Sequence, residues 1–372
     1  MKRTYFLILY LCIPLCLSGC WDQQQYEKLG FVLQMSIETS QDKGLLISYV
    51  SPVVDPNSKE NIEMISANVP LIRGAREAAR RISSKKPVGG MIQQLLISDF
   101  LAEKGLHNLM EVYQREPSTP TIPYIVITEG SPKHIMGTSQ NWGDKPLPGF
   151  YIHELIANNI EFSYVPDTTI LSFDSKFFSP GIDPIAPLIK MSNDKGKGVE
   201  VIGCALFSED KLVGKLNPRK TSMLLALMGE MKKTQYLNPS IGPEPLTSNN
   251  EGIAITLKLK KRKINVKIAN DKPIVDIFLN FTGRLNEYHW NTLYNSYIET
   301  TLEDQLSKAI KDECIEVLNY TQEVNSDPLG VGDIIRAKHK EYWKTVNWNN
   351  EYNKIAFHVN VNVNIIGRGI IR

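Results

Sequence analysis

The strongest constraint on the fold is a two-residue alternation of apolar and polar side chains in the last third of the chain. Successive side chains of a strand point to opposite faces, so such stretches predict strands with one buried and one wet face. The apolar positions are Ile253, Ile255, Leu257 and Leu259; Ile264, Val266 and Ile268; Val275, Ile277, Leu279 and Phe281; and Phe357, Val359, Val361, Val363 and Ile365. Half-buried sheets of this kind need a layer of helices on their apolar face.

A long amphipathic helix is predicted from about residue 289 to 324, before the last of these strands. Its apolar stripe recurs at helical spacing and consists of Ile298, Leu302, Leu306, Ile310, Cys314 and Val317. We therefore predict an α+β chain of several domains, with mixed or antiparallel sheets packed on helices and the long helix in the C-terminal domain.

The first half of the chain has a less regular pattern. The predicted elements are strands at 31–37, 45–54, 91–100 and 124–128, an arginine-rich helix at 70–82, a short helix capped by Ser98-Asp99, a loop at 131–148 and a helix at 151–159. The polar, glycine-bearing residues 191–198 are the best candidate linker. Beyond it, we predict a hairpin of 199–207 with 212–216 and a helix that Asn217 caps before Pro218.

The first residues form a processing signal rather than part of the fold. Lys2 and Arg3 precede an apolar run from Tyr5 to Leu17, which is followed by Ser18-Gly19-Cys20. The run has 13 residues and is interrupted by Pro14, so it is shorter than the roughly 20 residues that cross a bilayer. A basic start, a short apolar run and small residues before a cleavage point are typical of a secretory signal peptide.

The end of this signal, Leu17-Ser18-Gly19-Cys20, resembles the bacterial lipobox. The resemblance implies that residues 1–19 are removed and that Cys20 becomes the first residue and carries a thioether-linked diacylglycerol. No other cofactor is expected. An ordinary secretory signal ending in cysteine is the alternative, but charge, length and cleavage site together favour the lipoprotein.

The predicted mature chain, residues 20–372, is neutral, with 40 basic and 40 acidic side chains. Neutrality argues against broad electrostatic capture of nucleic acid or of anionic lipid. Three cysteines remain, namely Cys20, Cys204 and Cys314. The last two could form a disulfide in an exported protein, but both lie in apolar patterns, which favours buried free thiols. No second cysteine or histidine stands at ligand spacing, so no metal site is predicted.

Motifs for catalysis are incomplete. His153-Glu154 begins like a zinc-protease helix, but the position of the second histidine is Ala157, so we interpret the pair as a surface His and Glu. No nucleophile elbow, Walker A loop or dinucleotide-binding glycine motif occurs, and no catalytic residue is proposed. Gly330-Val331-Gly332 is interpreted as a turn that needs positive φ.

Two further groups of residues admit two interpretations. The basic run at 258–263 could contact lipid headgroups, but the surrounding alternation favours a solvated strand face and hairpin turn. Trp343 and Trp348 could form an exposed patch for a partner, or pack in the core beneath the last strand. We favour the core.

Several segments, in the same order along almost the whole chain, resemble the Ger(x)C (GerAC-like) family of spore germination lipoproteins, the C subunits of nutrient germinant receptors. They are 19–22; 74–83 with 101–106 and 115–116; Asp183-Pro184 with Pro187; 203–214; and 327–332 with Trp343, Trp348 and Gly369. The resemblance implies three α+β domains, which we divide into an N-terminal region at 20–190, containing one or two subdomains, and a C-terminal domain at 199–372.

The resemblance also implies a function without catalysis. The chain would be held by Cys20 on the outer face of the spore inner membrane, in complex with two integral-membrane subunits, A and B, and would be needed for germination in response to nutrients. The alternative is a solute-binding lipoprotein of a membrane transporter. Such proteins usually have two parallel α/β lobes, whereas antiparallel hairpins dominate the predicted C-terminal half.

Overall fold

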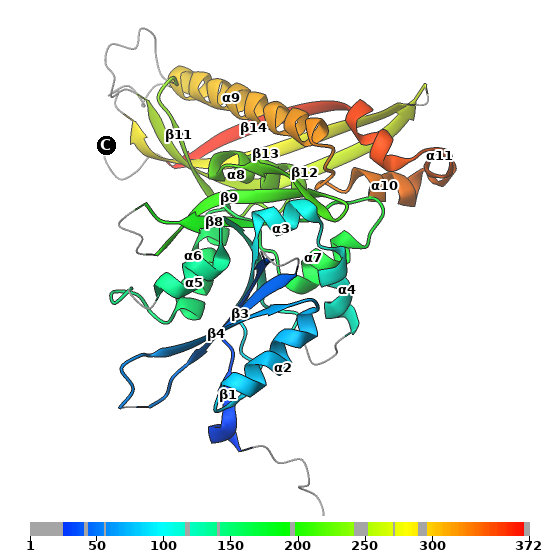
Figure 1. The fold of residues 1–372 in the computed structure, drawn as a ribbon. Coiled ribbons are helices and arrows are strands. Elements are labelled where there is room, and N and C mark those ends of the chain that lie inside the picture. Colours follow the sequence, from blue (N-terminus) through cyan, green and yellow to red (C-terminus); the bar gives the residue numbers. More distant parts are fainter. Residues whose placement is uncertain are drawn as a thin grey trace, which may run out of the picture.

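The computed structural model describes residues 25–40, 44–55, 57–115, 120–139, 142–193, 198–241, 252–270, 272–288 and 296–367. These residues form sheets of two, eight and four strands. Figure 1 shows them along one long direction, with β1 (Leu29–Phe31) at one end and the helix α9 (Ser296–Glu323) over the four-stranded sheet at the other. Mixed sheets packed on helices confirm the predicted α+β class.

The eight-stranded sheet forms the middle of the molecule. Its strands, in spatial order, are β10 (Lys211–Leu216), β9 (Val199–Ser208), β8 (Ile185–Met191), β7 (Tyr124–Glu129), β6 (Gln94–Ser98), β2 (Gln34–Thr39), β3 (Leu45–Pro52) and β4 (Ile62–Val69). The four central strands β8, β7, β6 and β2 are parallel, and both margins are antiparallel. The two-stranded sheet joins β1 to β5 (Lys86–Val88).

Helices cover both faces of this sheet. One face packs on α2 (Ile72–Ile82), α3 (Asp99–Lys104), α4 (His107–Arg115) and α7 (Ile170–Phe177), and the other on α5 (Pro132–Thr138) and α6 (Pro148–Glu161). Within β6, Leu95 and Ile97 belong to the first core, whereas Leu96 belongs to the second. A strand covered on both faces is apolar throughout, which is why this strand shows no alternation.

The sequence predictions for this half are partly right. The strands predicted at 31–37 and 45–54 are observed as β2 and β3, which pair antiparallel. The Ser98 cap is confirmed, since Ser98 Oγ accepts a hydrogen bond of 3.2 Å from the Leu101 amide. The loop predicted at 131–148 is wrong over α5, where Ser131 Oγ accepts from the His134 amide at 3.2 Å and caps a helix with proline in its first turn. Strand β4 was not predicted. The helix predicted at 70–82 is observed as α2, and Leu71 and Ile82 are exposed.

The sheet continues through the predicted linker. Strands β8 and β9 pair antiparallel on either side of it, with Met191 opposite Val199. The middle of the linker lies outside the described residues. One sheet thus contains strands from both predicted regions, and the division at 190/199 stays a prediction.

The four-stranded sheet consists of β11 (Thr234–Asn238), β12 (Ile253–Ala269), β13 (Lys272–Tyr288) and β14 (Ala356–Gly367). Strand β12 is continuous over 17 residues, so the hairpin turn predicted within 258–263 is wrong. The basic run instead lies on the strand and includes an irregularity between Leu259 and Lys261, where the pairing with β13 shifts. The alternation predicted for the last strand is confirmed, with Val359, Val363 and Ile365 buried.

Helices α8 (Pro218–Met228) and α9 pack on the apolar face of this sheet, and α10 (Val331–Lys338) and α11 (Lys340–Thr345) follow. Among the described residues, short 3₁₀ turns also lie at Tyr26–Lys28, Trp348–Asn350 and Tyr352–Lys354. Polar side chains of α9 also bind β14: Ser307 Oγ accepts from the Val363 amide at 3.0 Å, and Glu303 Oε1 from the Ile365 amide at 2.7 Å. These bonds satisfy amide groups on the outer side of the edge strand.

Both cysteines of the body are buried free thiols, as predicted. Cys314 lies in the stripe of α9, and Cys204 faces the same core from β9. Burial raises the pKa of the Cys204 thiol to about 12, which keeps it in the unreactive protonated form at neutral pH.

Candidate functional site

The predicted lipid-attachment residue, Cys20, and the predicted signal peptide lie outside the described residues. The described chain begins at Gln25, where a 3₁₀ turn leads into β1 and the ring of Tyr26 stacks on Phe31 with 6.2 Å between centroids. Among the helices of the described residues, none combines the length and the apolar character that a membrane crossing needs. Nor does a cluster of three potential metal-binding side chains occur among those residues.

A buried polar site lies where the eight-stranded sheet meets the C-terminal core. We call it the junction, and its centre is Asp327. The side chain of Asp327 is 1% exposed. Its carboxyl oxygens accept hydrogen bonds from the amides of Val331 (3.1 Å) and Gly332 (2.9 Å), in the first turn of α10, and from Trp348 Nε1 (3.2 Å). Burial raises the pKa of Asp327 to about 7, although these donors oppose the rise.

A second carboxyl group, that of Asp183, completes the junction. Its oxygens accept from the backbone amides of Asp327 (2.7 Å) and Glu209 (2.9 Å), and its own amide donates to the carbonyl of Asp327 at 2.9 Å. Burial raises the pKa of Asp183 to about 6. The segment before β8, the β9–β10 turn and the loop after α9 are thereby joined at one point.

Close packing at the junction requires glycine. A Cβ added to Gly332 would lie 2.5 Å from Trp348 Nε1 and 2.8 Å from the Cα of Gly181. Gly330 has φ of 68°, in the left-handed region, which confirms the predicted turn. The Gly-x-Gly pair is therefore structural, and serves to bring α10 against the segment before β8.

An open cavity of about 690 Å³ adjoins the junction. It is lined by His107, Phe177, Phe178, Ser179, Pro180, Ile182, Asp183, Glu209, Asp210, Trp343, Val346, Asn347, Trp348 and Asn349. The lining combines aromatic rings with three carboxyl groups and contains no lysine or arginine. Trp348 is 7% exposed, as favoured from the sequence, whereas the Trp343 ring is only partly buried and lies 5.7 Å from it, centroid to centroid.

The junction collects most of the segments that carry the resemblance to a known family. Asp183, the 203–214 hairpin and the 327–332 motif meet there directly. The segment at 101–106 meets the same hairpin, because the Leu106 amide donates to the carbonyl of Asp210 at 2.8 Å. Sequence spacing could not have shown this, since Asp183 and Asp327 are 144 residues apart.

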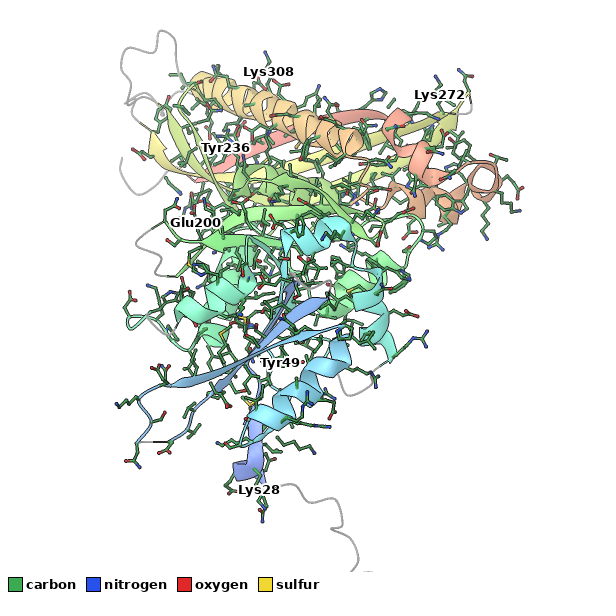
Figure 2. The ribbon with its side chains drawn as sticks, viewed as in Figure 1. Lys28, Tyr49, Glu200, Tyr236, Lys272 and Lys308 are labelled. Atoms are coloured by element: carbon green, nitrogen blue, oxygen red, sulfur yellow. The ribbon has the colours of Figure 1, made fainter. Side chains whose placement is uncertain are left out.

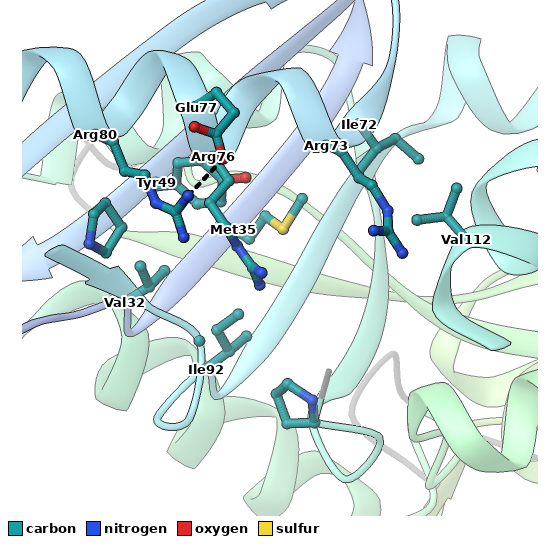
Figure 3. Close-up of a pocket in the computed structure, with 13 residues that line it drawn as sticks. Val32, Met35, Tyr49, Ile72, Arg73, Arg76, Glu77, Arg80, Ile92 and Val112 are labelled. Carbon is teal, nitrogen blue, oxygen red and sulfur yellow. Dashed lines mark hydrogen bonds and ion pairs between the residues drawn. The ribbon is translucent and has the colours of Figure 1, made fainter. Parts of the chain in front are cut away.

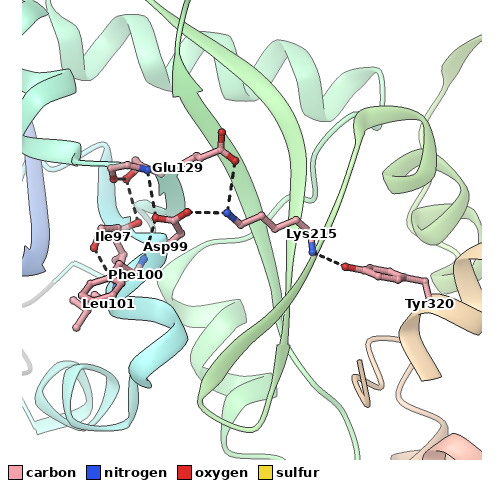
Figure 4. A network of polar contacts seen from close by, with 10 residues as sticks. Ile97, Asp99, Phe100, Leu101, Glu129, Lys215 and Tyr320 are labelled. Carbon is pink, nitrogen blue, oxygen red and sulfur yellow. Dashed lines mark hydrogen bonds and ion pairs between the residues drawn. The ribbon is translucent and has the colours of Figure 1, made fainter. Parts of the chain in front are cut away.

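A second polar network ties the sheet to α9 (Figure 4). Lys215 Nζ on β10 lies 2.7 Å from Asp99 Oδ2 and 3.6 Å from Glu129 Oε2, at the ends of β6 and β7. The amide of Lys215 donates to the hydroxyl of Tyr320 on α9 at 3.2 Å. Partial burial lowers the pKa of Lys215, but the two carboxylates outweigh it, and the pKa is raised. This network fixes the C-terminal core on the sheet.

The other sequence candidates lie on α6 and β12. His153 is half-buried, stacks on Tyr124 with 5.1 Å between ring centroids, and has its Nδ1 buried without a hydrogen-bond partner among the described residues. The surface position predicted for it is therefore only half right. On β12, Lys258, Lys260 and Lys263 are exposed on the strand face.

A smaller pocket of about 210 Å³ lies beside α2 (Figure 3). Three guanidinium groups of that helix, from Arg73, Arg76 and Arg80, surround it, above a floor of apolar side chains that includes Val32 and Ile92. Glu77 contributes the one carboxylate of the lining and lies 2.6 Å from Arg80 Nη1. The charged groups that line this pocket are mostly basic, whereas the cavity at the junction is lined by three carboxyl groups and by no lysine or arginine.

The fold and the junction together define an α+β protein whose buried carboxyl groups are hydrogen-bonded within its own chain. Comparison with known proteins supplies the family. The model of the spore germination protein N-terminal domain matches residues 22–191, and that of the spore germination B3/GerAC-like C-terminal domain matches 202–369. The chain therefore belongs to the GerAC-like family of spore germination proteins, as the resemblance in the sequence predicted.

Two relatives are similar to this chain over almost their whole length. Spore germination protein GerQC of Bacillus cereus is 22% identical, with 100% of this chain and 99% of that protein aligned. Spore germination protein B3 of Bacillus subtilis (strain 168) is also 22% identical, over 99% and 97% of the two chains. The crystal structure of the GerBC protein shares the fold, with a TM-score of 0.55 and 20% identity over 89% of this chain and 96% of that one.

Proposed function

We propose that this protein is a noncatalytic, lipid-anchored subunit of a spore nutrient germinant receptor. Diacylglycerol on Cys20 would hold it on the outer face of the spore inner membrane, beside two integral-membrane subunits, A and B. The observation that carries the proposal is the full-length match to proteins named for spore germination, in both halves of the chain. The lipobox at Cys20 supports the anchor.

The geometry suggests how such a subunit would stand on the membrane. Gln25 is five residue steps after Cys20, and an extended chain spans at most about 3.6 Å per step, or roughly 18 Å in all. A lipid on Cys20 would therefore keep the β1 end close to the bilayer. The four-stranded sheet and α9 would then point away from it (Figure 1).

The junction supports a structural role for the family motifs. Its carboxyl groups bind backbone amides and an indole of the same chain, and three separate segments depend on them. We infer that these motifs keep the two halves in one fixed arrangement, which a subunit that touches partners at several points would need.

The test is to replace Cys20 with alanine in the spore-forming host. We expect the protein to be lost from the membrane fraction and germination to be slower with at least one nutrient. Cys16→Ala is the matched control, because Cys16 lies in the segment predicted to be removed. Normal germination with a fully soluble Cys20→Ala protein would contradict the proposal.

Calorimetry separates this function from that of a solute-binding lipoprotein. The chain from residue 21 contains every residue that the structure describes and can be titrated with amino acids and sugars. We expect no tight binding by this subunit alone. Strong binding of one nutrient would favour the solute-binding alternative.

A further inference from the structure

The charges of this neutral chain are unevenly distributed. Residues 25–31 and 72–88, which we call the basic end, contain seven basic and two acidic side chains. The predicted mature chain has equal numbers of both signs, so the rest of it carries an excess of five negative charges. Six of the seven basic residues lie in the run 72–88, which includes the arginine-rich helix, and the fold adds Lys28 to them.

Strand pairing brings the two segments together. In the parallel pair of β1 and β5, Leu29 lies opposite Lys86, which places Lys28 beside Lys85 and Lys86. Helix α2 ends at Ile82, and β5 begins at Lys86 after three intervening residues, so Arg80 and Arg81 in the last turn of α2 lie near the same pair. Figure 2 shows Lys28 at the extreme tip of the molecule, far from Lys308 on α9.

Five of the seven basic residues are exposed, whereas Arg76 and Lys85 are half-buried. Lys28, Arg81 and Lys86 are exposed, and so is Arg80, although it is bound to Glu77. Two large apolar side chains are exposed among them: Tyr26 is 75% exposed and Ile82 is 65% exposed. Cationic groups interspersed with exposed apolar ones are characteristic of surfaces that lie in the headgroup layer of a membrane.

We propose that the basic end binds the phosphate-bearing headgroups of anionic phospholipids, with Tyr26 and Ile82 entering the headgroup layer. The chain that precedes the structure supports a bilayer as the occupant, because Cys20 is five residues from Gln25 at this end. That step rests on the proposed function. Guanidinium and ammonium groups are the usual protein ligands of phosphate, and a second contact would reinforce a lipid anchor.

Vesicle binding of the unlipidated chain tests the proposal. The chain from residue 21 is sedimented with vesicles of phosphatidylcholine alone, or of phosphatidylcholine mixed with phosphatidylglycerol. We expect binding only to the mixed vesicles, and weaker binding as the salt concentration rises. Each basic side chain near an anionic surface contributes roughly a fivefold factor, so Lys85→Glu with Lys86→Glu should weaken binding at least about tenfold.

The matched control reverses two exposed lysines at the other end of the molecule. Lys308→Glu with Lys311→Glu makes the same change of charge on α9 and should leave vesicle binding within about twofold of the unchanged chain, since these sites lie beyond a Debye length of about 10 Å from the surface. Circular dichroism of both variants verifies that they are folded.

Three results would overturn the proposal. They are equal binding to both kinds of vesicle, equal losses in the two double variants, and binding to polyglutamate without binding to vesicles, which would indicate an acidic protein partner instead. None of these measurements involves Cys20. Failure here would therefore leave the proposed anchor and receptor function untouched, and the Cys20→Ala experiment decides those separately.

Discussion

The junction and the basic end concentrate polar groups in opposite ways. At the junction, the carboxyl group of Asp327 is almost fully buried and accepts three hydrogen bonds from its own chain. The basic end contains seven cationic side chains and two acidic ones, and most of the cationic side chains face solvent. The junction is satisfied internally, whereas the basic end presents most of its cationic groups to solvent.

This difference separates structural motifs from candidate contact surfaces. A buried polar group without a partner costs free energy, so its own chain must bond it. An exposed charge is solvated by water and needs no partner in its own chain. A cluster of exposed like charges on an otherwise neutral protein therefore needs another explanation. Family motifs that converge on the junction therefore indicate a shared architecture rather than a shared ligand.

The largest effect should come from removing the acceptor at the junction. Asp327→Ala leaves two backbone amides and the indole of Trp348 buried without their partner. Each unsatisfied group costs about 1–3 kcal/mol, so the free energy of unfolding should fall by at least about 3 kcal/mol. Urea denaturation measures it. Asp312→Ala, at an exposed position of α9, is the control, and equal losses in both variants would show that the junction has no special role.

A smaller loss is expected from Gly332→Ala. The new methyl group would lie 2.5 Å from Trp348 Nε1, so the indole or α10 must shift. Such overpacking costs about 1–3 kcal/mol. Gly90→Ala is the matched control, because a Cβ there would meet nothing within 4 Å. Thermal unfolding that does not distinguish the two variants would refute the close approach.

The junction should also respond to pH. The folded-state pKa of Asp327, about 7, lies above its ordinary value of 3.8, so its contribution to stability is fully present below pH 4 and is lost as pH rises toward 7. The free energy of unfolding, relative to that of Asp327→Asn, should therefore fall over this range, by at most about 1.4 kcal/mol per pH unit. A difference that stays constant from pH 4 to 7 would mean that Asp327 remains ionised throughout.

The Lys215 network should contribute least. Its lysine side chain is 34% exposed and that of Asp99 is 17% exposed, so solvent screens the pair. Lys215→Ala should lower the free energy of unfolding by about 1 kcal/mol or less. Lys338→Ala, at an exposed position of α10, supplies the comparison in the same urea titration. If Lys215→Ala lowered the free energy of unfolding as much as Asp327→Ala, the Lys215 network rather than the junction would be the main connection between the two halves.

The sequence predicted the C-terminal strands better than the central sheet. Strands β13 and β14 have one wet face, and their apolar residues alternate accordingly. Strand β7 is covered on both faces, with Ile125 and Ile127 in one core and Val126 in the other, so its composition shows that it is buried but not which strands flank it. Strand β4 has polar residues at Glu63, Ser66 and Asn68, so its sequence lacks the apolar pattern that predicts a strand.

Prediction of the sites from the sequence was limited in the same way as prediction of the strands. Local chemistry predicted the Asn217 cap, the turn at Gly330 and the buried free thiols, because each depends on neighbours in sequence. The pairing of Asp183 with Asp327 and the assembly of the basic end depend on contacts between distant segments. Cys20 stays a prediction from the sequence.

The most direct test of the account is the distance from each end of the molecule to the membrane. A fluorophore is attached at Ser84→Cys, in the basic end, or at Lys308→Cys, on α9, in the chain processed and lipidated in its host, and is exposed to quencher lipids in the bilayer. We predict strong quenching at position 84 and little at position 308. Equal quenching at both positions, or stronger quenching at 308, would contradict the proposed attachment through the basic end.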